Sequence, residues 1–344
     1  MLPDQPSEQP HRRRPRYSGK YPRRFEEKYK ERNPELYPET IAKVLASGKT
    51  PAGAHRSIMV EEILQVLDPK PGEFALDCTL GYGGHAAAIL ARLQPGGRLI
   101  GFDVDPIEQP RTEERLRAMG FGPETFSVRH SNFAGIHKVV AEVGPADLLL
   151  ADLGVSSMQL DDPSRGFSVK TDGPLDMRMN PGRGRPASGY LEKIGTAELA
   201  IVLEGNADEP RSKDLAVLLA GKSFPTTTAL ATRIREALPR LPEEEQDKTI
   251  RRVFQALRIA VNDEFSALDA LLRNLPLCLK PGGRAAILTF HSGEDRRVKK
   301  AFASGLREGI YSQISDEVLR PSPEERNSNP RSASAKLRWA CRTG

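Results

Sequence analysis

The sequence has few of the features that mark membrane, secreted or metal-binding proteins. In its 344 residues no apolar run approaches the ~18 residues that span a bilayer. The first thirty residues are polar and rich in Pro and Arg, without the apolar core of a secretory signal. The three cysteines, Cys78, Cys278 and Cys341, form no C-x-x-C pair. We therefore predict no zinc or other metal site and no disulfide framework, and we expect a cytoplasmic protein.

Charge is also scarce in net terms, and the small excess is local. The chain carries 51 basic and 46 acidic residues, a formal net charge of +5. Much of the excess lies in 11–16 and 20–24, within a segment that lacks periodicity. We predict a flexible basic tail over residues 1–37. Two interpretations of it are open: it contacts the backbone and bases of a nucleic acid, or it is simply solvated.

The most informative stretch runs from residue 74 to residue 86. An apolar run ends at Asp77, glycines follow at Gly81, Gly83 and Gly84, and a helical pattern begins at Ala86. Strand, glycine turn and helix in this order form the first unit of a Rossmann-like sheet. The same spacing fits a dinucleotide fingerprint, and a tight turn without a ligand is a third interpretation. Asp77 favours a cation, such as the ammonium of S-adenosylmethionine, over a pyrophosphate that it would repel.

Acidic residues also end two further predicted strands. Strand 98–103 ends at Asp103, which lies 20 residues beyond Gly83, the spacing at which an acid reaches ribose hydroxyls. A carboxylate that caps the loop is the alternative. Strand 147–152 ends at Asp152, at the edge where ligands bind in open α/β sheets. Phe133 follows strand 125–129 and either lies against an adenine or packs in the core. Asp105 follows Asp103 closely, but no third metal ligand does.

The alternation of strands and helices then breaks. We predict an ordered loop over 166–179 and short helices over 187–248, followed by one long helix along the apolar stripe 254–272. Strand 284–290 ends in His291 and Ser292, and strands 311–314 and 336–342 complete a seven-stranded sheet. The predicted core comprises residues 38–160 and 250–344, and residues 161–249 form an inserted loop and helical subdomain.

Seven segments, in order, carry further motifs, and together they span about residues 55–342. They are Gly81-Tyr-Gly-Gly-His85, Asp103-Val-Asp-Pro106, Leu150-Ala-Asp-Leu-Gly-Val-Ser-Ser157 with Gln159-Leu-Asp161, Arg165-Gly-Phe-Ser168, Asp172-Gly-Pro-Leu-Asp-Met-Arg-Met179, Phe254-Gln-Ala-Leu-Arg-Ile-Ala-Val-Asn262 and Phe290-His-Ser-Gly-Glu-Asp-Arg296. In these segments the chain resembles the RsmH/MraW family of small-subunit rRNA (cytosine-N4)-methyltransferases.

The resemblance implies a class I, Rossmann-like methyltransferase with a mostly parallel sheet and a helical insertion for RNA recognition. It implies S-adenosylmethionine as methyl donor and a decoding-site cytidine of the 16S rRNA, in the 30S subunit, as acceptor. Asp103 would hold the ribose of the donor and Phe133 would flank its adenine. The expected cofactor-binding residues are Asp77, Gly81, Gly83, Gly84, His85, Asp103, Phe133, Asp152 and Gln159.

Methylation of an exocyclic amine requires acceptors that orient the amine toward the sulfonium methyl. The candidates are Asp152 and the carbonyls of residues 153–156. His291 and Ser292 would bind the base or receive its proton, although a structural histidine is the alternative for His291. Asp176 and Arg178 are the candidates for holding the flipped base or its phosphate.

Several positions depart from the family's pattern, chiefly at 206–209, 247–250 and Gly293, on the predicted RNA-facing side. They leave two alternatives open: a divergent paralogue that methylates another RNA nucleotide, and a catalytically silent RNA-binding relative. An NAD-dependent oxidoreductase is disfavoured because no constellation of residues for hydride transfer is evident.

Overall fold

The computed structural model describes residues 57–344 of the chain. The predicted basic tail over residues 1–37 and the beginning of the predicted core, up to residue 56, lie outside the described residues. Within residues 57–344 no helix is both long enough and apolar enough to cross a bilayer.

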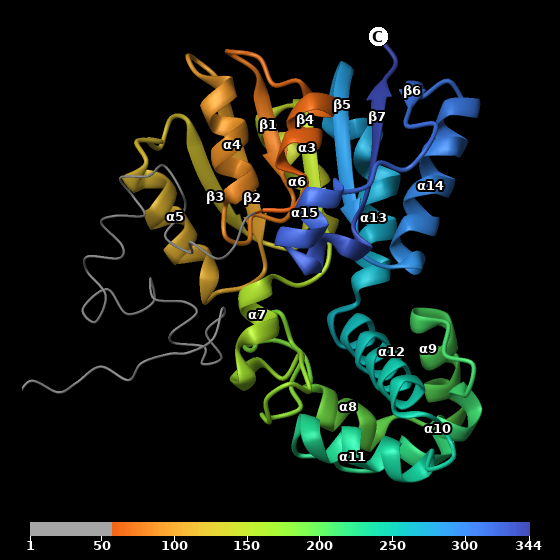
Figure 1. Ribbon diagram of the computed structural model, residues 1–344. Coiled ribbons are helices and arrows are strands. Elements are labelled where there is room, and N and C mark those ends of the chain that lie inside the picture. Colours follow the sequence, from red (N-terminus) through yellow and green to blue (C-terminus); the bar gives the residue numbers. More distant parts are fainter. Residues whose placement is uncertain (1–56) are drawn as a thin grey trace, which may run out of the picture. The chain divides into compact units, whose positions relative to one another are not determined.

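A single sheet of seven strands organises the described chain, in the order β3-β2-β1-β4-β5-β7-β6 (Figure 1). The first five strands run parallel, and β7 pairs antiparallel with both β5 and β6. The predicted seven-stranded, mostly parallel sheet is therefore confirmed. The strands are β1 (Phe74–Asp77), β2 (Arg98–Asp103), β3 (Phe126–His130), β4 (Ala146–Asp152), β5 (Leu279–Thr289), β6 (Tyr311–Ile314) and β7 (Lys336–Arg342).

Helices cover both faces of this sheet (Figure 1). One face packs against α6, α13 and α14, and the other against α3, α4 and α5. Burial on both faces explains why the central strands read as continuous apolar runs. The helices around the sheet are α3 (Val60–Leu67), α4 (Gly84–Leu93), α5 (Glu108–Ala118), η2 (Phe133–Gly135), α6 (Ile136–Val143), α13 (Glu264–Cys278), α14 (Ser292–Arg307), α15 (Pro323–Ser328) and η4 (Pro330–Ser334).

A second apolar cluster lies between β4 and β5 in the sequence. It buries Phe167, Leu175 and Met177 from the irregular segment together with helical residues as far as Leu257. The division into core and insertion stays a prediction, and α12 passes residue 250 without interruption. The elements of this region are α7 (Ser157–Asp161), η3 (Pro163–Arg165), α8 (Ala187–Lys193), α9 (Thr196–Ala207), α10 (Ser212–Leu219), α11 (Thr227–Ala237) and α12 (Glu243–Asn262).

The prediction of one helix along the stripe 254–272 is wrong. The helix ends at Asn262, and α13 begins at Glu264, because Asp263 adopts a left-handed conformation with φ 52°. Arg258 and Glu264 bridge the break with two hydrogen bonds of 2.8 and 2.9 Å. The apolar spacing continues across the break, so periodicity alone does not reveal it.

Two smaller features also differ from expectation. β5 begins at Leu279, before the predicted strand 284–290, and its register against β4 shifts between Ala146 and Leu148. The segment between β6 and β7, for which no helix is predicted, contains α15, which Ser322 caps by accepting a hydrogen bond from the Glu325 amide.

Candidate active site at the strand tips

The tips of β1 and β2 form one side of the site. Asp77 ends β1, and its carboxylate accepts a hydrogen bond from the Thr79 amide at 3.0 Å. Asp103 ends β2 and accepts one from the Gly81 amide at 2.7 Å. The glycine loop therefore already donates to a carboxylate, and it is held between two acids. This arrangement opposes a pyrophosphate and suits a positively charged ligand.

Glycines allow the loop to turn tightly into α4. Gly83 caps the helix in a left-handed conformation, with φ 77°. A Cβ on Gly83 would lie 2.8 Å from Cγ2 of Thr112, and one on Gly84 would lie 2.0 Å from Oγ of Ser57. The chain before α3 and the start of α5 therefore approach the loop closely, and both depend on the missing side chains.

His85, in the first turn of α4, reaches the tip of β4. Its Nε2 lies 2.9 Å from the carbonyl oxygen of Ile58, and its Nδ1 lies 3.5 Å from Oδ2 of Asp152. The Asp152 amide donates to Oγ1 of Thr79 at 2.6 Å, so Thr79 ties the tip of β4 to that of β1. The other carboxylate oxygen of Asp152, Oδ1, is buried and accepts no hydrogen bond within residues 57–344.

Three carboxyl groups in this site are hard to ionise. Burial raises the pKa of Asp77 and of Asp103 to about 6. Burial, and secondarily the charge of Glu294, raises the pKa of Asp152 to about 7. Burial also lowers the pKa of His85, so the histidine adds little positive charge at neutral pH. A bound cation would favour the ionised carboxylates and relieve this cost.

A buried network beside β2 was not predicted from the sequence. Oδ2 of Asp105 accepts hydrogen bonds from Nη1 of Arg165 and from Nε2 of Gln159, both at 2.8 Å. Gln159 also accepts from the Ser156 amide in a capping box that begins α7. Both ends of the Gln159 side chain are thus engaged within the protein. Asp105, which resembles a metal ligand in sequence, instead anchors an arginine.

Arg165 and Asn262 hold the irregular segment 166–179. Arg165 donates to the carbonyls of Arg178 and Met179 at 3.2 and 2.8 Å. The amide of Asn262 donates to the Met177 carbonyl and accepts from the Met179 amide, both at 2.7 Å. Both residues lie in segments that carried the family resemblance. That resemblance was the signal in the sequence that could have identified them, but it assigned neither residue a role. The predicted ordered loop is therefore fastened to α12.

Asp176 and Arg178, the predicted substrate ligands, pair with each other. The Arg178 guanidinium donates to both oxygens of Asp176, at 2.8 and 2.7 Å. The hydrogen bonds to Asp176 outweigh partial burial and raise the pKa of Arg178. The pair is partly buried and presents one bidentate unit, in which the arginine retains donors for a further acceptor.

The tip of β5 continues the row of polar groups. His291 caps α14 by accepting from the Glu294 amide, and its Nε2 lies 3.2 Å from Oε1 of Glu294. Oε2 of Glu294 accepts from the Phe290 amide at 2.8 Å. Although burial acts in the opposite direction, the hydrogen bond and charge of His291 keep the pKa of Glu294 below its usual value. Ser292 is exposed and donates to Asp208 at 3.1 Å.

Phe133 lies in η2, half-buried after β3, and packs partly against the apolar cluster formed with α13. The geometry is compatible with both interpretations of this residue. The structure thus gathers Asp77, Asp103, His85 and Asp152 around the glycine loop, whereas Ser292 points to the insertion.

Fold and site together define a class I methyltransferase. The chain belongs to the MraW methylase family, whose model matches residues 52–343. Among curated relatives, "Ribosomal RNA small subunit methyltransferase H 1" of Lachnoclostridium phytofermentans is 53% identical, over 88% of this chain and 85% of that protein. "Ribosomal RNA small subunit methyltransferase H 2" of Alkaliphilus metalliredigens is 50% identical, over 87% of this chain and 88% of that protein. One named "H", from Rubrobacter xylanophilus, is 40% identical over 85% and 97%.

S-adenosylmethionine is the methyl donor of this methylase. The residues present fit it, because a donor with a sulfonium and an ammonium group suits the buried Asp77 and the half-buried Asp103 and Asp152, whose pKa values are raised. It also suits the carboxylate oxygen of Asp152 that has no partner within residues 57–344. When bound, the donor supplies an electrophilic methyl group. The described residues would contribute the negative charge and the shape around it.

Proposed function

We propose that this chain transfers a methyl group from S-adenosylmethionine to the exocyclic amine of a decoding-site cytidine in small-subunit rRNA. Support comes from the family match and from relatives whose names give small-subunit rRNA as the methylated molecule. The cytidine and its N4 position follow from the resemblance of the seven sequence segments. The transfer is an in-line displacement, in which the amine nitrogen replaces the sulfur on the methyl carbon.

The observation that carries this proposal is the carboxyl group of Asp152. Its Oδ1 is buried and unpartnered within residues 57–344, and its pKa is raised to about 7, chiefly by burial. The amine of cytosine is a poor nucleophile because its lone pair is delocalised into the ring. An ionised Asp152 would accept a hydrogen bond from that amine, favour its pyramidal form and align it for attack.

On the donor side, Asp103 would hold the ribose and Asp77 would face the cationic end of the amino acid moiety. The loop from Gly81 to Gly84 would pass close to the donor. His85 would hold the Asp152 side chain in place through its Nδ1. Phe133 is proposed to flank the adenine. Gln159 would act through Asp105, because both ends of its side chain are already engaged.

On the substrate side, His291 at the tip of β5 would contact the base or receive the proton that the amine loses. Ser292 would hold the segment that follows α9, through its hydrogen bond to Asp208. The pair formed by Asp176 and Arg178 would bind the flipped nucleotide through the remaining arginine donors. The helical insertion would contact the surrounding RNA.

The direct test is transfer from labelled S-adenosylmethionine to small subunits and to naked small-subunit rRNA, followed by nucleoside analysis. N4-methylcytidine is the expected product, in molar proportion to the RNA. Label in another nucleoside would contradict the proposed acceptor. Donor binding without any turnover on either substrate would instead indicate a catalytically silent RNA-binding relative.

A second candidate is a paralogue that methylates another nucleotide of the same RNA. Four relatives at 48–53% identity carry the numbers 1 or 2 in their names, whereas four others at 40% identity carry none. Mapping the labelled position on the rRNA separates this candidate from the first. A modified nucleotide outside the decoding site would favour it.

A further inference from the structure

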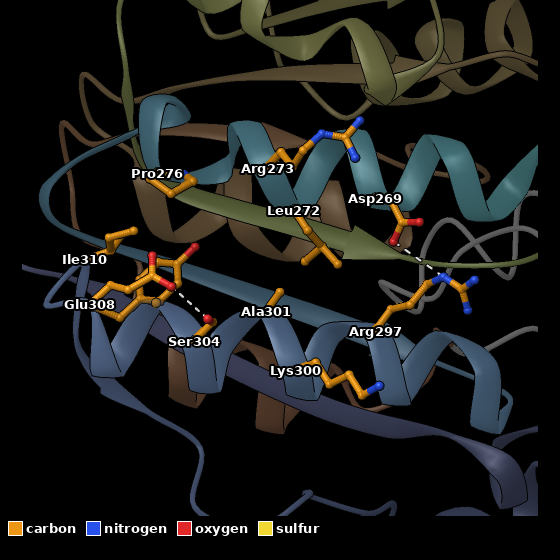
Figure 2. A pocket seen from close by; sticks show the side chains of 12 residues that line it. Asp269, Leu272, Arg273, Pro276, Arg297, Lys300, Ala301, Ser304, Glu308 and Ile310 are labelled. Atoms are coloured by element: carbon orange, nitrogen blue, oxygen red, sulfur yellow. Dashed lines mark hydrogen bonds and ion pairs between the residues drawn. The ribbon is translucent and has the colours of Figure 1, made fainter.

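A groove runs between α13 and α14, on the sheet face opposite α4 (Figure 2). It encloses a hollow of about 450 Å³. Leu272 and Ala301 lie between the two helices. Tyr311 also lines the groove. The charged residues that line the groove are Asp269, Arg273, Arg297, Lys300 and Glu308.

Basic residues outnumber acidic residues along this groove by three to two. Exposed Arg273 comes from α13 and exposed Lys300 from α14, and no ion pair involving either is found within residues 57–344. Asp269 partly offsets Arg297, with 3.4 Å between the charged atoms. Exposed Lys299 and Arg307 extend the positive charge along α14, beyond the groove itself. A second acid in the groove is Glu308, which accepts a hydrogen bond from Ser304 at 2.7 Å.

One end of the groove reaches the site at the strand tips. The guanidinium carbon of Arg297 lies 3.6 Å from the centre of the Phe265 ring, and that ring lies 5.7 Å from the ring of His291. Gly293 leaves room for the Phe265 ring, because a Cβ there would lie 2.6 Å from Cζ of Phe265. A contiguous path of side chains therefore leads from the tip of β5 to the cations of the groove.

We propose that this groove binds phosphates of the rRNA strand next to the target nucleotide. The inference rests on the proposed function, which provides the polyanion and brings it to His291. Two helices that present unpaired cations at both walls match the repeated negative charge of an RNA backbone. The contact is independent of sequence and positions the strand, whereas the site itself selects the base.

The test compares charge reversals inside and outside the groove. Lys300→Glu and the double variant Arg273→Glu/Lys300→Glu change the groove, and Arg92→Glu changes an exposed residue at the end of α4 on the other face of the sheet. Binding of a naked fragment of small-subunit rRNA is measured over a series of salt concentrations. Donor affinity and thermal unfolding are measured on each variant, to verify that the fold and donor site are intact.

We expect the double variant to bind RNA at least tenfold more weakly than Arg92→Glu, with unchanged donor affinity. The slope of log affinity against log salt should be shallower by about 1.4, because two contacts to a single-stranded backbone are lost. KM for RNA should rise while kcat at saturation is kept. Equal affinities and slopes in the groove variants and in Arg92→Glu would overturn the proposal.

Two other results have separate meanings. Weaker methylation of whole subunits with unchanged binding of naked RNA would assign the groove to a protein of the subunit and refute the phosphate contact. Wild-type protein that binds the donor but methylates no RNA would refute the proposed function itself, whatever the groove variants bind.

Discussion

Nδ1 of His85 lies 3.5 Å from Oδ2 of Asp152, which joins the first turn of α4 to the tip of β4. The opposite nitrogen, Nε2, lies 2.9 Å from the carbonyl oxygen of Ile58. A carbonyl oxygen only accepts, so Nε2 carries a proton and a neutral ring presents its lone pair to Asp152. Burial lowers the pKa of His85 and raises that of Asp152, so without a bound cation both side chains favour their neutral forms.

The first prediction concerns the charge of Asp152. Asp152→Asn keeps the shape of the side chain but loses the carboxylate that would orient the amine. We expect kcat to fall by about 10²- to 10⁴-fold, the usual contribution of a positioned acid or base, in single-turnover methyl transfer to small subunits. Asp147→Asn is the matched control, because Asp147 lies at the other end of β4 and bonds Lys280 and the Phe74 amide.

Asp147→Asn should lower stability slightly and keep kcat. Undiminished kcat in Asp152→Asn, with product identity verified, would remove Asp152 from the chemistry.

Donor affinity should depend on pH. The pKa values of Asp77, Asp103 and Asp152 are about 6, 6 and 7, above the ordinary value for aspartate because of burial. The cationic donor favours the ionised forms, so binding should release protons and Kd should rise as pH falls below about 7. Calorimetry in buffers of different ionisation enthalpy, between about pH 5 and about pH 8, measures both effects.

The same shifts affect the donor-free protein with a definite sign. A raised pKa in the folded state means that these groups favour folding most below the unfolded value, about pH 4, and lose that contribution as pH rises through 6 and 7. The thermal shift caused by the donor should therefore grow with pH over this range. A donor Kd that stays constant from about pH 5 to about pH 8 would contradict a donor site formed by these three carboxyl groups.

Asn262 should be required to hold the irregular segment 166–179. Asn262→Ala leaves the Met177 carbonyl and the Met179 amide without their partner, which we expect to cost about 1–3 kcal/mol in urea denaturation. Hydrogen exchange over residues 172–180 should accelerate. Asn274→Ala is the control, because Asn274 donates only to the Ala270 carbonyl within α13, and its loss should cost less than about 0.5 kcal/mol. Similar losses of unfolding free energy in the two variants would contradict the role of Asn262 in holding this segment.

The charge of Glu294 should raise the pKa of Asp152. After burial, its negative charge is the second cause that raises the pKa of Asp152, and its carboxylate also bonds the Phe290 amide. Glu294→Gln keeps an acceptor for that amide but removes the charge. The acidic limb of the kcat profile, which reports ionisation of Asp152, should therefore move to lower pH. Glu317→Gln, at an exposed position, should leave the profile in place, and an unmoved profile in Glu294→Gln would refute the coupling.

Much of the sheet was predictable from local patterns. The predicted limits of strands 98–103, 311–314 and 336–342 are confirmed to the residue. Burial of both faces leaves apolar runs that stop where the chain turns, so strands β1, β2 and β4 could be read with their acidic ends. The break at Asp263 was missed because both helices continue one apolar spacing, and the conformation of a single residue decides it.

The sequence by itself determined that acids follow apolar strands beside a glycine turn, because each of these signals lies within a few neighbouring residues. Only the tertiary structure decided which of them meet. Asp105 receives Arg165 from sixty residues away, Asp152 faces His85, and Asn262 holds a segment more than eighty residues before it. Such pairings depend on how strands and helices pack in three dimensions, and hydrogen bonds between distant residues leave no periodic trace in the chain.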